Sequence, residues 1–141
     1  MVRLCTSQLL LVVTVVFMCG SIHARSSLKV IRKFQDIPSN YVYAQQALWF
    51  SMKDFNKNSN DKYSFKVVKI LKVQEQVAES LNYFLVVKIA RTTCKKFSGE
   101  NGHCLIQKNP KMKKMLLCNF IVAFKPWTFE HYMLKKQCKD V

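Results

Sequence analysis

The stretch Leu81-Asn82-Tyr83-Phe84-Leu85-Val86-Val87-Lys88-Ile89 decides the fold of this chain. Leucine, tyrosine, leucine, valine and isoleucine occupy every second position from 81 to 89. An apolar period of two is typical of a β-strand that turns one face toward a hydrophobic core. We therefore expect a half-buried strand here, and the segments around it must supply the cover for its apolar face.

The flanking segments predict further strands. Residues 63–67 alternate apolar and polar side chains, whereas residues 68–73 are apolar on both phases, which a β-bulge or burial on two faces would explain. Residues 76–80 are expected to form a turn. Alternation resumes over 116–124 until a proline stops it, and a last short strand is expected at 132–138. Together these segments predict an antiparallel meander.

A single helix is expected before the strands. After Pro38, Ser39 or Asn40 is a suitable cap, and an apolar stripe follows at steps of three or four residues: Tyr41, Ala44, Leu48, Met52 and Phe55. Short polar residues at 56–61 favour a turn that ends the helix. The predicted fold is therefore α+β, with the helix packed on one face of the sheet, and residues 25–38 form an arm that leads to an early strand.

The N-terminus has the pattern of a secretory signal peptide. An apolar run from Leu9 to Phe17 follows Arg3, and small or polar residues lead to Ala24. The run is too short to cross a bilayer, and no second long apolar stretch follows. We expect residues 1–24 to be removed, with cleavage after Ser21 as the alternative, and residues 25–141 to be a secreted, extracellular domain without a transmembrane segment.

Cysteine usage fits an oxidising compartment. The mature segment keeps four cysteines, an even number that predicts two disulfides: Cys94, Cys104, Cys118 and Cys138. Three pairings are possible from the sequence alone. A metal site is not expected, because the separations of 10, 14 and 20 residues lack the close ligand pairs of zinc sites. No cofactor is expected either.

The charge of the chain is strongly positive. There are 23 Lys and Arg against 8 Asp and Glu, a net charge of +15, and loss of Arg3 with the signal peptide leaves 22 minus 8, or +14. Such a charge favours anionic cell surfaces, either membranes or glycans, over a neutral partner. The basic residues gather in the arm, before the fourth strand and at the C-terminus: Arg25, Lys29, Arg32, Lys33, Lys108, Lys111, Lys113, Lys114, Lys135, Lys136 and Lys139.

Several motifs resemble the type 2 cystatin family. They are Asn82-Tyr83-Phe84-Leu85, Arg91-Thr92-Thr93-Cys94, the cysteine separations of 10 and 20, and Pro126-Trp127 before the last strand. The cystatin-related epididymal spermatogenic subgroup is similar in further tracts: Leu48-Trp49-Phe50, Asp61-Lys62-Tyr63 and Cys138-Lys139-Asp140-Val141. The resemblance implies a long helix across a curved antiparallel sheet of four to five strands, with Cys94 bonded to Cys104 and Cys118 to Cys138.

The resemblance also implies reversible, non-covalent inhibition of papain-like cysteine proteases. In this family an arm with a hinge glycine and two loops enter the active-site cleft together. The second loop corresponds to Pro126-Trp127. The first loop, of pattern Q-x-V-x-G, corresponds to Gln76, Val77, Ala78, Glu79 and Ser80. Gln76 matches the pattern, whereas Ala78 replaces valine and Ser80 replaces glycine.

These departures predict weak inhibition of papain-like enzymes. Serine in a position that needs a positive φ costs roughly 1 kcal/mol relative to glycine, and Glu79 adds a charge to a surface that must lose water. The arm has no glycine between residues 25 and 40. A loss of about 3 kcal/mol over two of the three edges weakens binding about a hundredfold.

Some type 2 cystatins inhibit legumain, the asparaginyl endopeptidase, through an asparagine in the loop after the helix. Ser59, Asn60 and Asp61 stand at the matching position, although the same residue types also suit an ordinary turn. The resemblance further implies a specialised role in sperm development or maturation, and a monomer that can exchange its helix and first strand to form a domain-swapped dimer.

Other classes of function fit less well. The mature segment has two histidines, His103 and His131, and no G-x-S-x-G or H-E-x-x-H motif, so an enzyme is not expected. His131 is interpreted as a surface residue. Nucleic-acid binding is not expected, because no reading helix or aromatic stacking platform is evident. A basic surface-binding or antimicrobial protein of the reproductive tract is the alternative to a protease inhibitor.

Overall fold

The computed structural model describes residue 8 and residues 10–15, 32–97 and 103–141. It divides into two units, Met1–Ile31 and Arg32–Val141. In the first unit residues 10–15 are helical, and both predicted cleavage positions lie outside the described residues. No helix in the described ranges has the length and apolar character needed to span a membrane.

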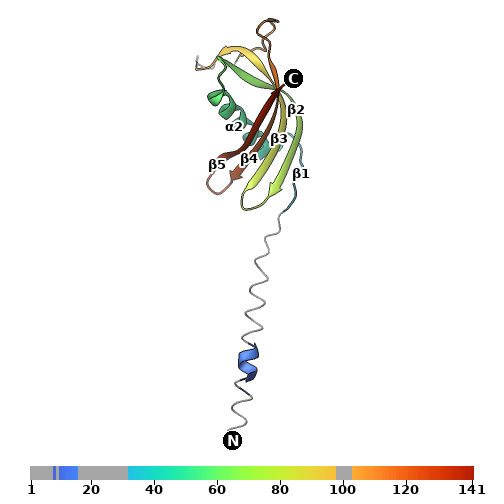
Figure 1. Cartoon of the computed structure of the whole chain (residues 1–141), viewed down its shortest axis with the longest axis vertical. Helices are drawn as coiled ribbons and strands as arrows, with labels where there is room; N and C mark the ends of the chain where they lie inside the picture. Colours follow the sequence, from blue (N-terminus) through green and yellow to red (C-terminus); the bar gives the residue numbers. More distant parts are fainter. Residues whose placement is uncertain (1–7, 9, 16–31, 98–102) are drawn as a thin grey trace. The chain divides into compact units, whose positions relative to one another are not determined.

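The second unit is a five-stranded antiparallel sheet with one helix against it (Figure 1). The strands are β1 (Gln35–Asp36), β2 (Tyr63–Val77), β3 (Leu81–Lys95), β4 (Met115–Lys125) and β5 (Glu130–Asp140), and they neighbour one another in chain order. The predicted α+β meander is confirmed. The arm leads to a strand of only two residues, and the last strand is longer than predicted.

Alternation in β3 places its apolar side chains on the helix side of the sheet. Tyr83, Leu85, Val87 and Ile89 are all buried, and alternate residues of β4 join them in the core. Burial of each aliphatic side chain contributes about 1.5–3 kcal/mol. The hydroxyl of Tyr83 donates a hydrogen bond of 2.8 Å to Glu75 on β2, and burial together with this carboxylate raises the pKa of Tyr83.

β2 contains the bulges that its mixed phases predict. Its register with β3 shifts between Tyr63 and Phe65, between Val67 and Lys69, and between Ile70 and Lys72. The second and third shifts each insert a β2 residue that has no partner on β3, so two consecutive side chains share one face. At the first shift the additional residues are on β3, between Arg91 and Lys95. The bulges therefore keep Phe65 and Val73 in the core despite the irregular spacing of apolar residues in the sequence.

Helix α2 (Val42–Asn58) packs on the sheet through small side chains. Ala44, Ala47, Leu48 and Ser51 are buried, and Met52 and Phe55 pack against the core from its edge. The predicted cap was wrong: Tyr41 is the N-cap and makes no side-chain capping hydrogen bond. The predicted stripe was also wrong at Tyr41, whose side chain is exposed because this residue precedes the first helical turn.

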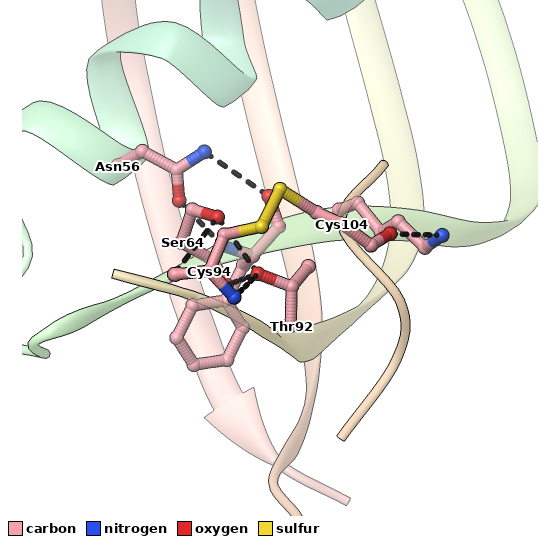
Figure 2. Close-up of a disulfide and its surroundings, with 7 residues drawn as sticks. Asn56, Ser64, Thr92, Cys94 and Cys104 are labelled. Atoms are coloured by element: carbon pink, nitrogen blue, oxygen red, sulfur yellow. Dashed lines mark hydrogen bonds between the residues drawn. A yellow bond between two sulfur atoms is a disulfide. The ribbon is translucent and has the colours of Figure 1, made fainter. Parts of the chain in front are cut away.

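The end of α2 is fastened to β2 by one amide side chain. Asn56 donates a hydrogen bond of 3.0 Å to the carbonyl oxygen of Phe65 and accepts one of 2.8 Å from the amide of the same residue. Figure 2 shows Asn56 beside Ser64 and the disulfide. Both backbone groups of Phe65 are thus paired although the bulge removes part of the strand ladder.

The two disulfides join Cys94 to Cys104 and Cys118 to Cys138, which confirms the pairing implied by the family. The second bridge links directly opposed residues of β4 and β5. Beside the first bridge the hydroxyl of Thr92 donates 2.9 Å to the carbonyl oxygen of Ser64, and the amide of Cys94 donates 3.2 Å to Thr92 Oγ1 (Figure 2).

His131 is only in part the surface residue that the sequence suggested, because its side chain is half-buried. Its imidazole stacks on Phe124 and on Phe50 of α2, with ring centroids 4.6 Å and 5.3 Å away. Its Nε2 is buried without a hydrogen-bond partner. Burial lowers the pKa of His131 because a charged imidazolium between two rings loses its hydration.

This histidine should make stability depend on pH. With a pKa below 6.5 in the folded protein, His131 takes up protons less readily than in the unfolded chain. We therefore expect the free energy of unfolding to be highest above about pH 6.5 and to decrease as the pH is lowered below this value. Guanidinium titrations of the oxidised protein between about pH 7 and about pH 5 measure this slope.

The variant His131→Phe should lose the pH dependence in this interval, because a phenylalanine can occupy the stack without titrating. His103→Gln is the matched control, since His103 is exposed and lies outside the core. Equal pH slopes for the wild type and for His131→Phe would contradict the assignment.

Candidate functional site at the hairpin turns

Two hairpin turns lie at the same end of neighbouring strands. Val77 pairs with Leu81 at the end of the β2–β3 hairpin, and Lys125 pairs with Glu130 at the end of the β4–β5 hairpin. Leu81 in turn pairs with Phe124 across β3 and β4. Figure 1 shows the two hairpin tips beside each other. Residues 76–80 and Pro126-Trp127 therefore occupy one rim of the sheet.

The first turn is tighter than predicted. Gln76 and Val77 belong to β2, and only Ala78, Glu79 and Ser80 form the turn. The amide of Ala78 donates a hydrogen bond of 3.0 Å to the carbonyl oxygen of Ser80. The hydroxyl of Ser80 donates one of 2.9 Å to Asn82. These bonds fix the turn from within, and the exposed side chains at its tip are those of Ala78 and Glu79.

The side chain of Gln76 is hydrogen-bonded within the protein. Its Nε2 donates a hydrogen bond of 2.8 Å to the carbonyl oxygen of Arg32, and its Oε1 accepts one of 3.0 Å from Asn82. The amide side chain therefore links the arm, β2 and β3. Gln76 therefore stabilises the rim and is less suited to contact a protease.

Ser80 lacks the backbone strain that a positive φ would cause. Within the described part of the chain, Phe97 and Phe129 are the non-glycine residues with a positive φ, so Ser80 has an ordinary backbone conformation. The expectation of strain at this position was conditional on a positive φ. A serine therefore suits this turn as well as a glycine would.

The second turn presents two aromatic side chains. Trp127 is 65% exposed and Phe129 is 77% exposed. The amide of Thr128 donates a hydrogen bond of 3.2 Å to the carbonyl oxygen of Lys125, and Phe129 follows with a φ of 55°. Sequence reasoning missed Phe129. A short hairpin connection commonly needs a left-handed residue near its end, and in the absence of glycine from 126–129 this residue had to supply it.

The described part of the arm is held against the same end of the sheet. β1 pairs with β2, the amide of Ile37 donates 3.1 Å to the carbonyl oxygen of Val73, and the ring of Phe34 packs edge-on against Phe84 with centroids 6.1 Å apart. Residues 25–31 lie outside the described residues. From Arg32 onward, the arm is a fixed element of the rim.

The strained position in the second turn gives a test. A bulky residue at a φ of 55° costs roughly 1–2 kcal/mol relative to glycine. We expect Phe129→Gly to raise the free energy of unfolding by about 1 kcal/mol, after allowance for the greater entropy of glycine in the unfolded chain. Chemical denaturation measures the change.

Phe129→Ala is the matched control, since it removes the same ring without relieving the backbone. It should not stabilise the protein. If the two variants unfold at the same denaturant concentration, the left-handed conformation carries no strain in solution.

The second predicted site, Ser59-Asn60-Asp61, lies at the opposite end of β2. Ser59 is the C-cap of α2, and its carbonyl oxygen accepts a hydrogen bond from Lys96 Nζ. Asp61 accepts 2.9 Å from the amide of Tyr63 and forms an ion pair with Arg91. Asn60 between them is exposed. The loop is thus fixed on both sides of one accessible asparagine.

Charge and hydrogen bonding together lower the pKa of Asp61. Partial burial raises its pKa, but the hydrogen bonds from Arg91 and Tyr63 and the charge of Arg91 outweigh burial, so the pKa of Asp61 lies below its ordinary value. The guanidinium also donates 2.6 Å to the carbonyl oxygen of Met112. Arg91 therefore ties the loop after the helix to the segment that precedes β4.

One helix across a five-stranded antiparallel sheet, two exposed turns on one rim and two consecutive disulfides define a class of small protease inhibitors. The cystatin domain family matches residues 33–127, and the chain belongs to the cystatin family. Its members inhibit proteases and are not enzymes, which agrees with the expectation from the sequence. Within the described residues no group of three or more His, Cys, Asp or Glu could hold a metal ion.

Individual relatives support this assignment. The chain is similar to Cystatin-13 of the mouse, Mus musculus, with 55% identity over 100% of both chains. It is also similar to human Cystatin-8, with 42% identity over 79% of this chain and 78% of the relative. These matches confirm the resemblance to type 2 cystatins and to the subgroup named above.

A solved structure agrees with the fold. The crystal structure of dimeric human cystatin F superposes with a TM-score of 0.73 at 30% identity, covering 82% of this chain and 92% of that one.

Proposed function

We propose that this protein is a secreted inhibitor of cysteine proteases that places its two hairpin turns together in the active-site cleft. The observation that carries the proposal is the exposed Trp127 on the same rim as the turn formed by Ala78, Glu79 and Ser80. An exposed tryptophan at the tip of a hydrogen-bonded hairpin is an anchor that loses water on binding.

The proposed mechanism is physical exclusion of substrate. No covalent bond forms with the enzyme. Affinity therefore depends on side chains that become buried and on turns that already have their bound conformation. Trp127 and Phe129 supply apolar area, while the hydrogen bonds of Ser80 and Gln76 hold the first turn. Little conformational entropy is then lost on binding, because both turns are closed by strand pairing.

We propose weak inhibition of papain-like enzymes for two reasons. Glu79 is an exposed carboxylate at the tip of the first turn, and a charge that is desolvated without a partner opposes binding. The arm has no glycine, and from Arg32 to Ile37 it is bonded to the sheet. Ser80 does not add to the weakness, since its φ is not positive.

Papain and a cathepsin test the proposal directly. We expect measurable but weak inhibition by the protein without residues 1–24, and Trp127→Ala should weaken it about thirtyfold, the equivalent of about 2 kcal/mol for a central anchor. Glu79→Val should strengthen binding by removing the charge. Inhibition constants from steady-state assays measure both effects.

Trp49→Ala is the matched control, because Trp49 is equally exposed but lies on α2 beside Lys53, away from the rim. It should leave the inhibition constants unchanged. The proposal fails if neither enzyme is inhibited at micromolar concentration, or if Trp49→Ala weakens inhibition as much as Trp127→Ala.

Legumain is a second candidate target. Support comes from the exposure of Asn60 and from the bonds that hold its two neighbours to Lys96 and Arg91. A protease that cleaves after asparagine requires that side chain to project into its pocket, and a fixed loop presents it at low entropic cost. This site lies at the other end of β2 from the rim, so the two activities would be independent.

We expect Asn60→Ala to abolish inhibition of legumain and to leave inhibition of papain unchanged. Trp127→Ala should weaken inhibition of papain and leave inhibition of legumain unchanged. Asn40→Ala, which alters an exposed asparagine near the rim end, is the control. Inhibition of legumain that survives Asn60→Ala would exclude this loop as the site.

Secretion and the biological setting are part of the proposal. The apolar run from Leu9 to Phe17 supports removal of residues 1–24, and two disulfides suit an oxidising compartment. The similarity to the epididymal spermatogenic subgroup supports a role in sperm development or maturation. In such a role, weak inhibition of papain-like enzymes would restrict the proteases that the protein inhibits to a narrower set.

A further inference from the structure

The outer face of the sheet is a separate surface of the molecule. Val87 and Ile89 point toward α2, so Lys88 between them points away from the helix. In the described residues, the helix packs on the inner face alone (Figure 1). The outer face therefore has no role in the core, and it is distinct from the rim and from the Asn60 loop.

The bulges of β2 enlarge this face. Between Val67 and Ile70, which both pack on the core, the strand places Val68 and Lys69 opposite the single residue Lys88. The next shift does the same with Leu71 and Lys72 opposite Val86. Val68, Lys69, Leu71 and Lys72 are all exposed. The irregularity that preserves the core thus adds two lysines to the outer face.

Strand register aligns three lysines in a row across four strands. Lys69 pairs with Lys88, Lys88 pairs with Leu117, and Leu117 pairs with Lys139. With neighbouring strands about 4.8 Å apart, the row is about 14 Å long. Lys72 and Lys135 lie on the same face, opposite Val86 and Ile121. We call these five residues the lysine face: Lys69, Lys72, Lys88, Lys135 and Lys139.

The lysine face is not neutralised within the described part of the protein. Within the described residues none of its five side chains forms an ion pair or a hydrogen bond. By contrast, Lys136 on the inner side pairs with Asp54 at 3.0 Å, and Lys66 Nζ donates a hydrogen bond of 2.9 Å to the carbonyl oxygen of Cys104. Like charges directly opposite each other on adjacent strands destabilise a sheet. The Lys69–Lys88 pair is therefore unfavourable until an anion approaches it.

Acidic residues are scarce on the same face. Glu75 points inward to Tyr83, and Asp36 on β1 accepts a hydrogen bond of 2.9 Å from Gln74 at the sheet edge. Asp54 and Asp61 are paired on other surfaces. The positive charge of the outer face is consequently concentrated, in contrast to the mixed charge of an ordinary solvated surface.

We infer that the lysine face binds a linear sulfated polysaccharide of the glycosaminoglycan class, with its sulfate and carboxylate groups along the row from Lys69 to Lys139. The row is linear and has the rigid backing of a sheet, which suits a polymer with repeated charges. The side chains of Val86, Leu117 and Ile121 between the lysines are partly buried, while Val68 and Leu71 beside Lys69 and Lys72 are exposed. The charge of the row carries the inference, because a linear polyanion can contact Lys69, Lys88 and Lys139 together, and the vesicle experiment below tests a lipid bilayer as the other anionic partner.

Binding to a defined heparin dodecasaccharide tests this inference. Affinity is measured by calorimetry on the oxidised protein without residues 1–24 at about 0.15 M NaCl and at several other salt concentrations. The triple variant Lys69→Gln, Lys88→Gln, Lys139→Gln should bind at least about tenfold more weakly. Its plot of log affinity against log salt should be shallower by about three, by the counterion argument that holds for nucleic acids.

A matched control removes the same charge from another basic cluster: Lys108→Gln, Lys111→Gln, Lys113→Gln, three exposed residues in the loop before β4. It should retain affinity within about threefold. The single variant Lys88→Gln provides a second measurement, and it should unfold at the same or a higher temperature than the wild type because one repulsion is removed.

Three outcomes would overturn the inference. Equal losses in the two triple variants would mean that net charge alone determines binding. Binding to vesicles of phosphatidylserine and phosphatidylcholine without binding to the dodecasaccharide would assign the face to a membrane. Absence of both interactions at about 0.15 M NaCl would exclude an anionic partner for this face. None of these results depends on protease inhibition, so the test is independent of the function proposed above.

Discussion

The packing of β3 against α2 is the contact on which the rest of the structure depends. Tyr83, Leu85, Val87 and Ile89 lie under Ala44, Ala47 and Leu48, and small residues on the helix allow its backbone to approach the sheet closely. A shift of one residue in β3 would move every one of these side chains to the opposite face. The register of β3 with β2 and β4 is thereby fixed, and with it the position of both hairpin turns on one rim.

Much of the fold could be predicted from local patterns of apolar residues, because each pattern reflects which side chains a strand or helix turns toward the core. Alternation at 81–89 and 116–124 locates β3 and β4, and the mixed phases at 68–73 indicate the bulges of β2. The cap at Tyr41 could not be predicted in this way. The backbone at the helix start is held by hydrogen bonds from Tyr41 to Pro38 and from Gln45 to Tyr41, so no side-chain acceptor at Ser39 or Asn40 is needed.

The candidate site was predicted less completely than the fold. Residue types identify Trp127 and Asn60 as exposed turn residues, but the hydrogen bond from Gln76 to Arg32, the left-handed backbone at Phe129 and the stacking of His131 on Phe50 depend on the folded structure. His131 directly follows Glu130, and its partial burial results from Phe50 on the helix and Phe124 on β4. The row of lysines on the outer face likewise appears only when the strand register is known.

The location of the two disulfides has a consequence for association between copies of the chain. Both bridges lie within residues 94–138, on the C-terminal side of the turn that joins β2 and β3. The segment 32–77, which contains β1, α2 and β2, has no cysteine, and apart from the turn that continues the chain it is held to the rest by packing, hydrogen bonds and two ion pairs, Asp54–Lys136 and Asp61–Arg91. If the turn at Ala78, Glu79 and Ser80 straightens, this segment is free to pack in a second molecule without reduction of any sulfur–sulfur bond. Oxidising conditions therefore place no covalent barrier against such an exchange.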